Sequence, residues 1–194
     1  MSATVKNTCI MTAIACVFGL LLGVVHAVTL EPIKVQQKLT LDRAYRSVMS
    51  SAEEFVDTGV TTEEAAISIA SGDYNAQIDN VQEAKDASGS TVGYVINVTS
   101  HGGYGGDISF SMGVDLTGSI QGISITKIAE TPGLGMKAQT DPAWLPQFYG
   151  KSGDTEFNLG EDGINSITSA TFTSRCVTRG INAGLAYFRD KLAS

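Results

Sequence analysis

The sequence predicts an α+β fold: a single N-terminal transmembrane helix, followed by a compact domain in which an antiparallel sheet is flanked by helices. Three observations predict it. No charged residue lies between Lys6 and Glu31. From residue 74 to 128, short β-rich runs alternate with tight turns, as in an antiparallel meander. An apolar stripe at helical spacing runs through the end of the chain.

Length and composition exclude several functions. The chain has 194 residues, and beyond the apolar segment it suits one domain. A formal net charge of −7 argues against nucleic acid as a partner. Of three cysteines, only Cys176 lies outside the apolar segment. A disulfide framework, a structural zinc site and a self-contained iron–sulfur cluster are therefore excluded from the domain. With only two histidines, the chain has few candidate ligands for a metal site and few candidate bases for a Ser-His-Asp hydrolase. We expect no metal site and no catalytic residues, so redox work requires an organic cofactor.

Residues 1–7 are expected to form a short tail and residues 8–30 a transmembrane helix. At about 1.5 Å per residue, that helix spans a bilayer core of about 30 Å. Two alternatives are a signal peptide cleaved after Ala27 and a lipoprotein signal that ends at Cys16. Basic residues are more numerous after this segment than before it. Taken alone, the positive-inside count favours a cytoplasmic C-terminal domain.

Residues 31–72 are predicted to form a helical stalk. Apolar residues recur near the helical period as far as Phe55 and Val56, and Gly59 ends this stretch. A second segment, rich in Ala and Ile, occupies residues 61–72.

Residues 73–194 are predicted to form the domain. Strands are expected over residues 76–84, 92–98, 108–114 and 120–128, with turns at residues 88–90 and 116–118. A short helix is expected over residues 141–149. The terminal helix is the most clearly predicted element, because one apolar stripe runs along it: Val177, Ile181, Leu185, Phe188 and Leu192.

Hydroxyl side chains are concentrated just before the terminal helix, in residues 165–174. They suit two alternatives. They can cap the free N–H groups of the first helical turn. They can also form a phosphate site in which one hydroxyl is esterified, because a helix N-terminus favours an anion. Ser169 and Ala170 are small and allow a ligand to approach the backbone.

Three other features suggest loops rather than chemistry. Glu130–Gly135 is a turn after the last strand, and Glu130 is expected to be a solvated charge. Residues 102–106 are predicted to form a glycine-rich hairpin turn, with His101 a solvated loop residue. Cys176, at the start of the terminal helix, is either a thiol of lowered pKa or a structural thiol.

Two of these segments resemble motifs of one known family. Ile164–Ser174 resembles the attachment motif of bacterial FMN-binding domains, in which a threonine carries FMN through a phosphoester. Glu130–Gly135 is similar to the second signature of that family. Tyr104–Gly106, Gly113–Asp115 and Trp144–Lys151 also fit. At two positions the chain departs from the motif: Asn165 stands where the family usually has Asp, and Ser169 where it often has Gly.

Within this family the chain most resembles G subunits of the Rnf complex, an ion-pumping ferredoxin:NAD⁺ oxidoreductase. The C subunit of the sodium-pumping NADH:quinone oxidoreductase is the second match. The resemblance implies an electron-transfer subunit, without catalysis of its own, in a membrane redox complex with other subunits. It implies covalent FMN, attached by a flavin transferase, and residues 73–194 as an FMN-binding domain. It also places this domain on the extracytoplasmic side of the cytoplasmic membrane, against the charge count.

The resemblance also implies a set of cofactor-binding residues. Thr171 carries the phosphoester, and the hydroxyls of Thr168, Ser169 and Thr173 donate to phosphate oxygens next to the small Ala170. The turn that contains Glu130, Thr131, Gly133 and Leu134 lies against the isoalloxazine or the ribityl chain.

Two further functions remain as alternatives. A pilin-like structural protein has a similar order of elements, although residues 8–30 lack the acidic residue that pilins place there. A secreted, soluble flavoprotein would result from cleavage after Ala27.

Overall fold

The computed structural model describes residues 3–60, 63, 74–152, 156–160 and 163–193. The chain forms two compact units, Met1–Thr40 and Leu41–Ser194. The first unit is the greater part of one long helix, α1 (Ala3–Val48). Among the described residues, α1 is the one helix long and apolar enough to cross a membrane, and none of its most apolar window is buried.

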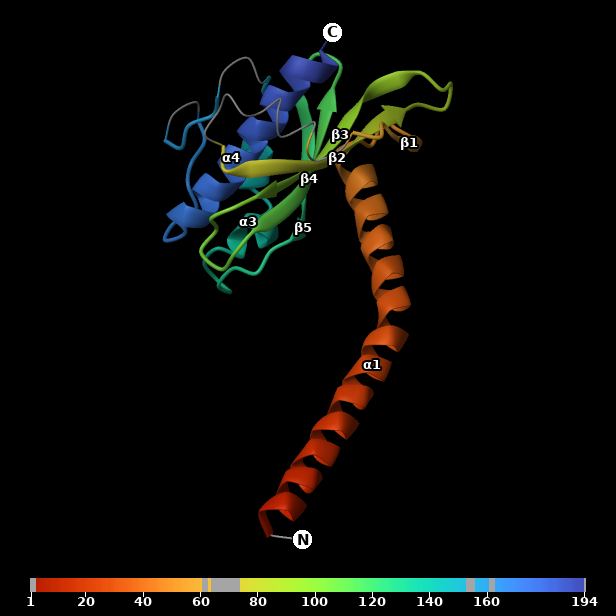
Figure 1. The fold of residues 1–194 in the computed structure, drawn as a ribbon. Helices are drawn as coiled ribbons and strands as arrows, with labels where there is room; N and C mark the ends of the chain where they lie inside the picture. Colours follow the sequence, from red (N-terminus) through yellow and green to blue (C-terminus); the bar gives the residue numbers. More distant parts are fainter. Residues whose placement is uncertain (1–2, 61–62, 64–73, 153–155, 161–162, 194) are drawn as a thin grey trace. The chain divides into compact units, whose positions relative to one another are not determined.

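The second unit is built on an antiparallel sheet in the order β1-β2-β3-β4-β5 (Figure 1). Its strands are β1 (Glu54–Asp57), β2 (Ala76–Lys85), β3 (Thr91–Ser100), β4 (Ile108–Asp115) and β5 (Ile120–Lys127). Each strand pairs with the next one along the chain; Val98 of β3, for example, lies opposite Phe110 of β4. The predicted α+β fold with an antiparallel meander is confirmed.

One part of the predicted stalk helix is wrong. Helix α1 ends at Val48, and Phe55 and Val56 lie in β1. β1 is the edge strand next to β2, where Phe55 lies opposite Ala84. A short apolar run does not distinguish helix from strand by its periodicity. Residues 54–57 form a strand because the free edge of β2 offers them backbone hydrogen bonds. The predicted segment 61–72 lies outside the described residues, apart from Glu63.

The larger core lies between one face of the sheet and helix α4 (Thr171–Tyr187), which continues into a π-helical turn, η2 (Phe188–Leu192). In Figure 1, α4 runs across the sheet as the blue helix. Side chains alternate along a strand, so Ile96 and Val98 face this core. The predicted apolar stripe is confirmed: Val177, Ile181, Leu185 and Phe188 are buried, and Leu192 packs against the same core.

The opposite face of the sheet is covered by residues at the end of α1. Tyr45, Val48 and Met49 are buried with Ala84 and Val95. The polar side chain on this face is also satisfied: Asn97 donates to the Tyr45 hydroxyl over 2.9 Å and accepts from the Ser111 hydroxyl over 2.6 Å. Burial raises the pKa of the Tyr45 hydroxyl, although the hydrogen bond from Asn97 opposes this shift.

The segment after β5 differs in detail from the predicted helix 141–149. It contains a single α-helical turn, α3 (Lys137–Thr140), and a 3₁₀ turn, η1 (Leu145–Phe148). Residues 141–144 separate them, and the Asp141 carboxylate accepts a hydrogen bond from the N–H of Ala143 over 2.9 Å. A continuous helix is interrupted here because Pro142 and Pro146 lack the N–H that it needs.

The β4–β5 turn yields a prediction on acid stability. The Asp115 carboxylate accepts hydrogen bonds from the N–H and hydroxyl of Thr117, the N–H of Ser119 and the side chain of Gln121. Burial raises the pKa of Asp115, but these bonds outweigh it, and the pKa is lowered. Asp115 therefore stabilises the fold above the unfolded-state pKa of about 4 and ceases to do so as the pH falls through its folded pKa. Asp115→Asn is expected to lower the free energy of unfolding by about 1 kcal/mol at pH 7. Urea titrations should show this difference shrinking at pH 3, and an equal loss at both values would contradict the assignment.

Candidate functional site

The start of α4 meets the segment that follows β5 at a buried carboxylate. Glu130 is 5% exposed. It accepts a hydrogen bond from the Thr173 hydroxyl over 3.0 Å and another from the N–H of Gly105 over 3.1 Å. The sequence prediction of a solvated charge at Glu130 is therefore wrong. This carboxylate joins the β3–β4 loop, the turn after β5 and the first turn of α4.

Two glycines allow these segments to come this close. A Cβ on Gly105 would lie 2.1 Å from the carbonyl oxygen of Ala129. A Cβ on Gly135 would lie 2.5 Å from a carboxylate oxygen of Glu130 and 2.6 Å from the Thr173 hydroxyl. All three distances are shorter than the contacts that a Cβ atom makes in proteins. The glycine-rich loop does connect β3 to β4, as predicted, and it also closes over the end of β5.

A pocket of about 350 Å³ lies where these segments converge. It contains most of the cofactor-binding residues expected from the sequence, and its lining consists of Tyr104, Glu130, Thr131, Leu134, Gly135, Ser169, Ala170, Thr171, Phe172 and Thr173. Gly133 lies in the same turn with a φ of 76°. Thr168 lies apart: it is exposed and lines a neighbouring pocket of about 320 Å³.

Two aromatic residues of this lining, Tyr104 and Phe172, were not among the expected cofactor-binding residues, although both lie in segments that resemble the family motifs. Tyr104 is 76% exposed and Phe172 is 65% exposed. With Leu134, which is 42% exposed, they give the pocket an apolar rim. A signal was present, because each aromatic residue interrupts a segment otherwise made of glycines or hydroxyl residues. Exposed large apolar groups around a pocket mark a surface suited to an apolar ligand.

The hydroxyls near the start of α4 do not act as an N-cap. Ala170 is the N-cap residue, and its side chain makes no capping hydrogen bond. The Ser174 hydroxyl donates to the carbonyl oxygen of Ala170 and accepts from the N–H of Ile167. Thr173 is engaged by Glu130. Thr171, the first residue of the helix, is exposed, and no hydrogen bond of its hydroxyl to the described part of the chain is recorded.

Two hydrogen bonds hold the segment before Thr171 at Asn165. The indole N–H of Trp144 donates to the carbonyl oxygen of Asn165 over 2.8 Å, and the N–H of Asn165 donates to the Gln147 side chain over 2.9 Å. Ser169 has a φ of 62°, a conformation that glycine adopts more easily than serine. The positive φ of Ser169 explains why glycine often stands at this position in the attachment motif that residues 164–174 resemble.

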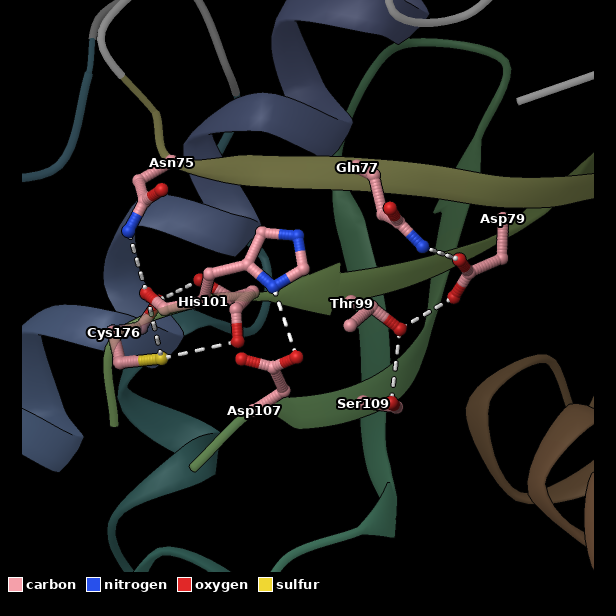
Figure 2. A network of polar contacts seen from close by, with 9 residues as sticks. Asn75, Gln77, Asp79, Thr99, His101, Asp107, Ser109 and Cys176 are labelled. Atoms are coloured by element: carbon pink, nitrogen blue, oxygen red, sulfur yellow. Dashed lines mark hydrogen bonds and ion pairs between the residues drawn. The ribbon is translucent and has the colours of Figure 1, made fainter. Parts of the chain in front are cut away.

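Cys176 is a structural thiol. It is buried one turn into α4, and its sulfur lies 3.4 Å from the carbonyl oxygen of Ser100 and 3.7 Å from that of His101 (Figure 2). Burial raises the pKa of the thiol, which is the opposite of activation. Nδ1 of His101 lies 3.0 Å from a carboxylate oxygen of Asp107, and Figure 2 shows these two side chains pointing toward each other. This pair closes the base of the glycine-rich loop, so His101 is more than a solvated loop residue.

The α+β fold and the pocket at the start of α4 are consistent with an FMN-binding domain, and comparison with known proteins supports this class. Residues 103–186 match the sequence model of the FMN-binding domain family. This region includes Tyr104, the turn with Glu130 and the start of α4. A solved structure shares the fold: the C subunit of the Na(+)-translocating NADH-quinone reductase from Parabacteroides distasonis is 20% identical, with a TM-score of 0.55, and the match covers 82% of this chain and 95% of that one.

Two relatives define the family more narrowly. The G subunit of the Na(+)-translocating ferredoxin:NAD(+) oxidoreductase complex of Acetobacterium woodii is 30% identical over 188 residues, which is 93% of this chain and 88% of the relative. The G subunit of the ion-translocating oxidoreductase complex of Shewanella loihica is 30% identical over 193 residues, 95% of this chain and 89% of the relative. The chain belongs to the family of G subunits of ion-translocating oxidoreductase complexes, the family expected from its motifs. This membership argues against the pilin-like alternative.

Proposed function

We propose that the chain is a membrane-anchored electron-transfer subunit of an ion-translocating oxidoreductase complex, and that it carries FMN through a phosphoester on Thr171. One observation carries the proposal. Thr171 is exposed at the first position of α4, on the wall of the pocket that contains most of the expected cofactor-binding residues. The family of the chain and its match to the FMN-binding domain support this assignment.

The start of α4 suits the phosphate. A phosphoester on Thr171 carries one negative charge, and the free N–H groups and dipole of a helix N-terminus stabilise such a charge. Because Ala170 offers no capping side chain, the first-turn N–H groups are available to phosphate oxygens. Thr173 was expected to donate its hydroxyl to a phosphate oxygen, but in the structure it has another partner. Its hydroxyl donates to Glu130 and thereby fixes this turn.

The rest of the pocket suits the apolar ring of the cofactor. Tyr104, Leu134 and Phe172 offer exposed apolar surface, and the pocket volume lies at the lower end of the range of about 300–1,000 Å³ for ligand sites. The bound flavin supplies the redox chemistry. The chain itself binds and orients it, and the covalent bond keeps it at a fixed effective concentration near other redox centres.

The attachment step requires an activated donor. Condensation of Thr171 with FMN itself would have to expel water from the phosphate. With flavin adenine dinucleotide as donor, the Thr171 oxygen instead forms the new P–O bond while the diphosphate bond breaks. AMP is released, and the hydroxyl proton passes to a base of the flavin transferase. No electron is transferred in this step.

Helix α1 supplies the membrane anchor in this proposal. Residues 8–30 cross the membrane after a tail of residues 1–7, and residues 31–40 connect this span to the second unit. That unit, Leu41–Ser194, contains the FMN-binding domain and lies on the extracytoplasmic side. The apolar side chains of the span are exposed, including Met11, Leu22 and Val28, and lipid would cover them. The partners are other subunits of the complex and, during maturation, the flavin transferase.

The attachment is tested by flavin fluorescence in a denaturing gel. The full chain is produced together with a flavin transferase as wild type, Thr171→Ala, Thr171→Ser and Thr140→Ala, an exposed hydroxyl outside the pocket. Wild type and Thr140→Ala are expected to fluoresce, Thr171→Ser to fluoresce at least in part, and Thr171→Ala to be dark. A fluorescent Thr171→Ala band would assign the bond to another residue, and a dark wild-type band would refute covalent attachment.

A further inference from the structure

A second cavity, of about 850 Å³, lies along α4 on the other side of Thr171. Thr171 lines both this cavity and the FMN pocket. The α4 side chains that line the second cavity are Thr171, Arg175, Thr178, Arg179 and Asn182. Residues three and four positions apart share one face of a helix. The apolar stripe of α4 faces the sheet, so this polar face is a separate feature of the same helix.

The walls of this cavity are held by hydrogen bonds. The Asn182 side chain accepts from the N–H of Phe157 over 2.9 Å and donates to its carbonyl oxygen over 3.0 Å. The Tyr74 hydroxyl donates to the Glu156 carboxylate over 2.7 Å. Asn182 is 6% exposed and Tyr74 8% exposed. The two bonds of Asn182 fix Phe157 against α4, and Tyr74 holds Glu156 beside it, so this wall of the cavity is preformed.

Two guanidinium groups line this cavity, those of Arg175 and Arg179. Neither Arg175 nor Arg179 forms an ion pair recorded with the described residues, although the chain has 20 acidic side chains against 13 basic ones. The carboxylate of Glu156 in the same cavity receives the hydrogen bond from Tyr74. Like charges four residues apart on a helix repel each other. An anion placed between the two guanidinium groups would remove this repulsion.

We propose that this cavity binds a phosphoryl group between Arg175 and Arg179. Planar guanidinium forks match phosphate oxygens in pairs. Helical side chains lean towards the N-terminus, which brings the Arg175 guanidinium back towards Thr171. Ser166 and Thr171, which both carry a hydroxyl, also line this cavity. The cavity is larger than one phosphate and leaves room for an organic group attached to it.

Such a phosphoryl group has two sources. One is the phosphodiester on Thr171 itself, and this source rests on the proposed function. In that case Arg175 neutralises the linkage and is a positioning residue for the flavin. The other source is a separate phosphorylated ligand that enters from solvent.

The test uses inorganic pyrophosphate as the probe, titrated calorimetrically at low ionic strength into the full-length Thr171→Ala protein in detergent. Saturable binding is expected, and Arg175→Gln and Arg179→Gln, each added to this background, should weaken it about tenfold. Lys127→Gln, which removes an exposed positive charge at the end of β5, is the matched control and should leave binding unchanged. No binding, or binding that neither arginine substitution weakens, would overturn the proposal. Thermal unfolding verifies that each variant is folded. Where an Arg→Gln variant does not fold, the Arg→Lys variant replaces it, because lysine keeps the charge but lacks the guanidinium fork.

The same titration of flavin-bearing wild type separates the sources. Loss of pyrophosphate binding would assign the cavity to the phosphodiester on Thr171, whereas undiminished binding would assign it to a separate phosphorylated ligand. If no flavin attaches to the wild type, the proposed function fails, but the titration of Thr171→Ala still decides whether the cavity binds a phosphoryl group.

Discussion

Replacement of Glu130 by alanine is expected to lower the free energy of unfolding by about 3 kcal/mol and to abolish most flavin attachment. The substitution leaves the N–H of Gly105 and the hydroxyl of Thr173 without their acceptor. Hydrogen bonds to a charged group contribute about 1.5–3 kcal/mol each. The loop with Tyr104, the turn with Leu134 and the start of α4 are then no longer joined at one point. Urea titration followed by the fluorescence of Trp144, which is buried, measures the loss of stability, and in-gel fluorescence measures attachment.

Glu130→Gln is the matched control for this change. Glutamine has the same shape; its amide oxygen can accept from Gly105, and its amide N–H can donate to the Thr173 hydroxyl. We expect it to lose less than half as much stability as the alanine variant. A loss below about 1 kcal/mol in Glu130→Ala would show that the three segments are held together by other contacts.

The sequence predicts the elements whose pattern is long. Strands β2 to β5 and helix α4 each extend over eight or more residues, and the sequence predicts all of them. The error lies at Phe55 and Val56, in a strand of only four residues. Its pairing partner, β2, begins about 20 residues further along the chain. The local periodicity of residues 54–57 contains no information about this partner. Their conformation depends on the free edge of β2, with which they pair.

The candidate site was predicted from its motifs, and the structure brings the turn at residues 130–135 and the start of α4 into one pocket. The burial of Glu130 was not predictable, because it depends on the β3–β4 loop folding back over the end of β5. The arginines of the second cavity were missed for a different reason. The terminal helix was interpreted by its apolar stripe alone, and that stripe contains no information about a cavity on the other face of the helix.

Replacement of Gly113 by valine is expected to destabilise the second unit by about 3 kcal/mol. Gly113 of β4 lies opposite Gly122 of β5, and the backbone of Val48 lies directly over this pair. A Cβ on Gly113 would lie 2.3 Å from the carbonyl oxygen of Val48, and one on Gly122 would lie 2.8 Å from its Cα. Backbone atoms cannot rotate away as a side chain can. The end of α1 must therefore shift, and the buried contacts of Tyr45, Val48 and Met49 would be lost in part.

The same urea titration measures this effect, with Ser124→Val as the control for introducing valine into β5. Ser124 is half-buried two residues beyond Gly122 on the same strand, so its change should stay within about 0.5 kcal/mol. Gly113→Ala should be intermediate, because one methyl group meets the same carbonyl oxygen without the additional branches. Equal stabilities of Gly113→Val and Ser124→Val would mean that the end of α1 does not rest on the paired glycines. A large loss confined to the glycine variants would show that this flat contact fixes residues 41–48 on the sheet.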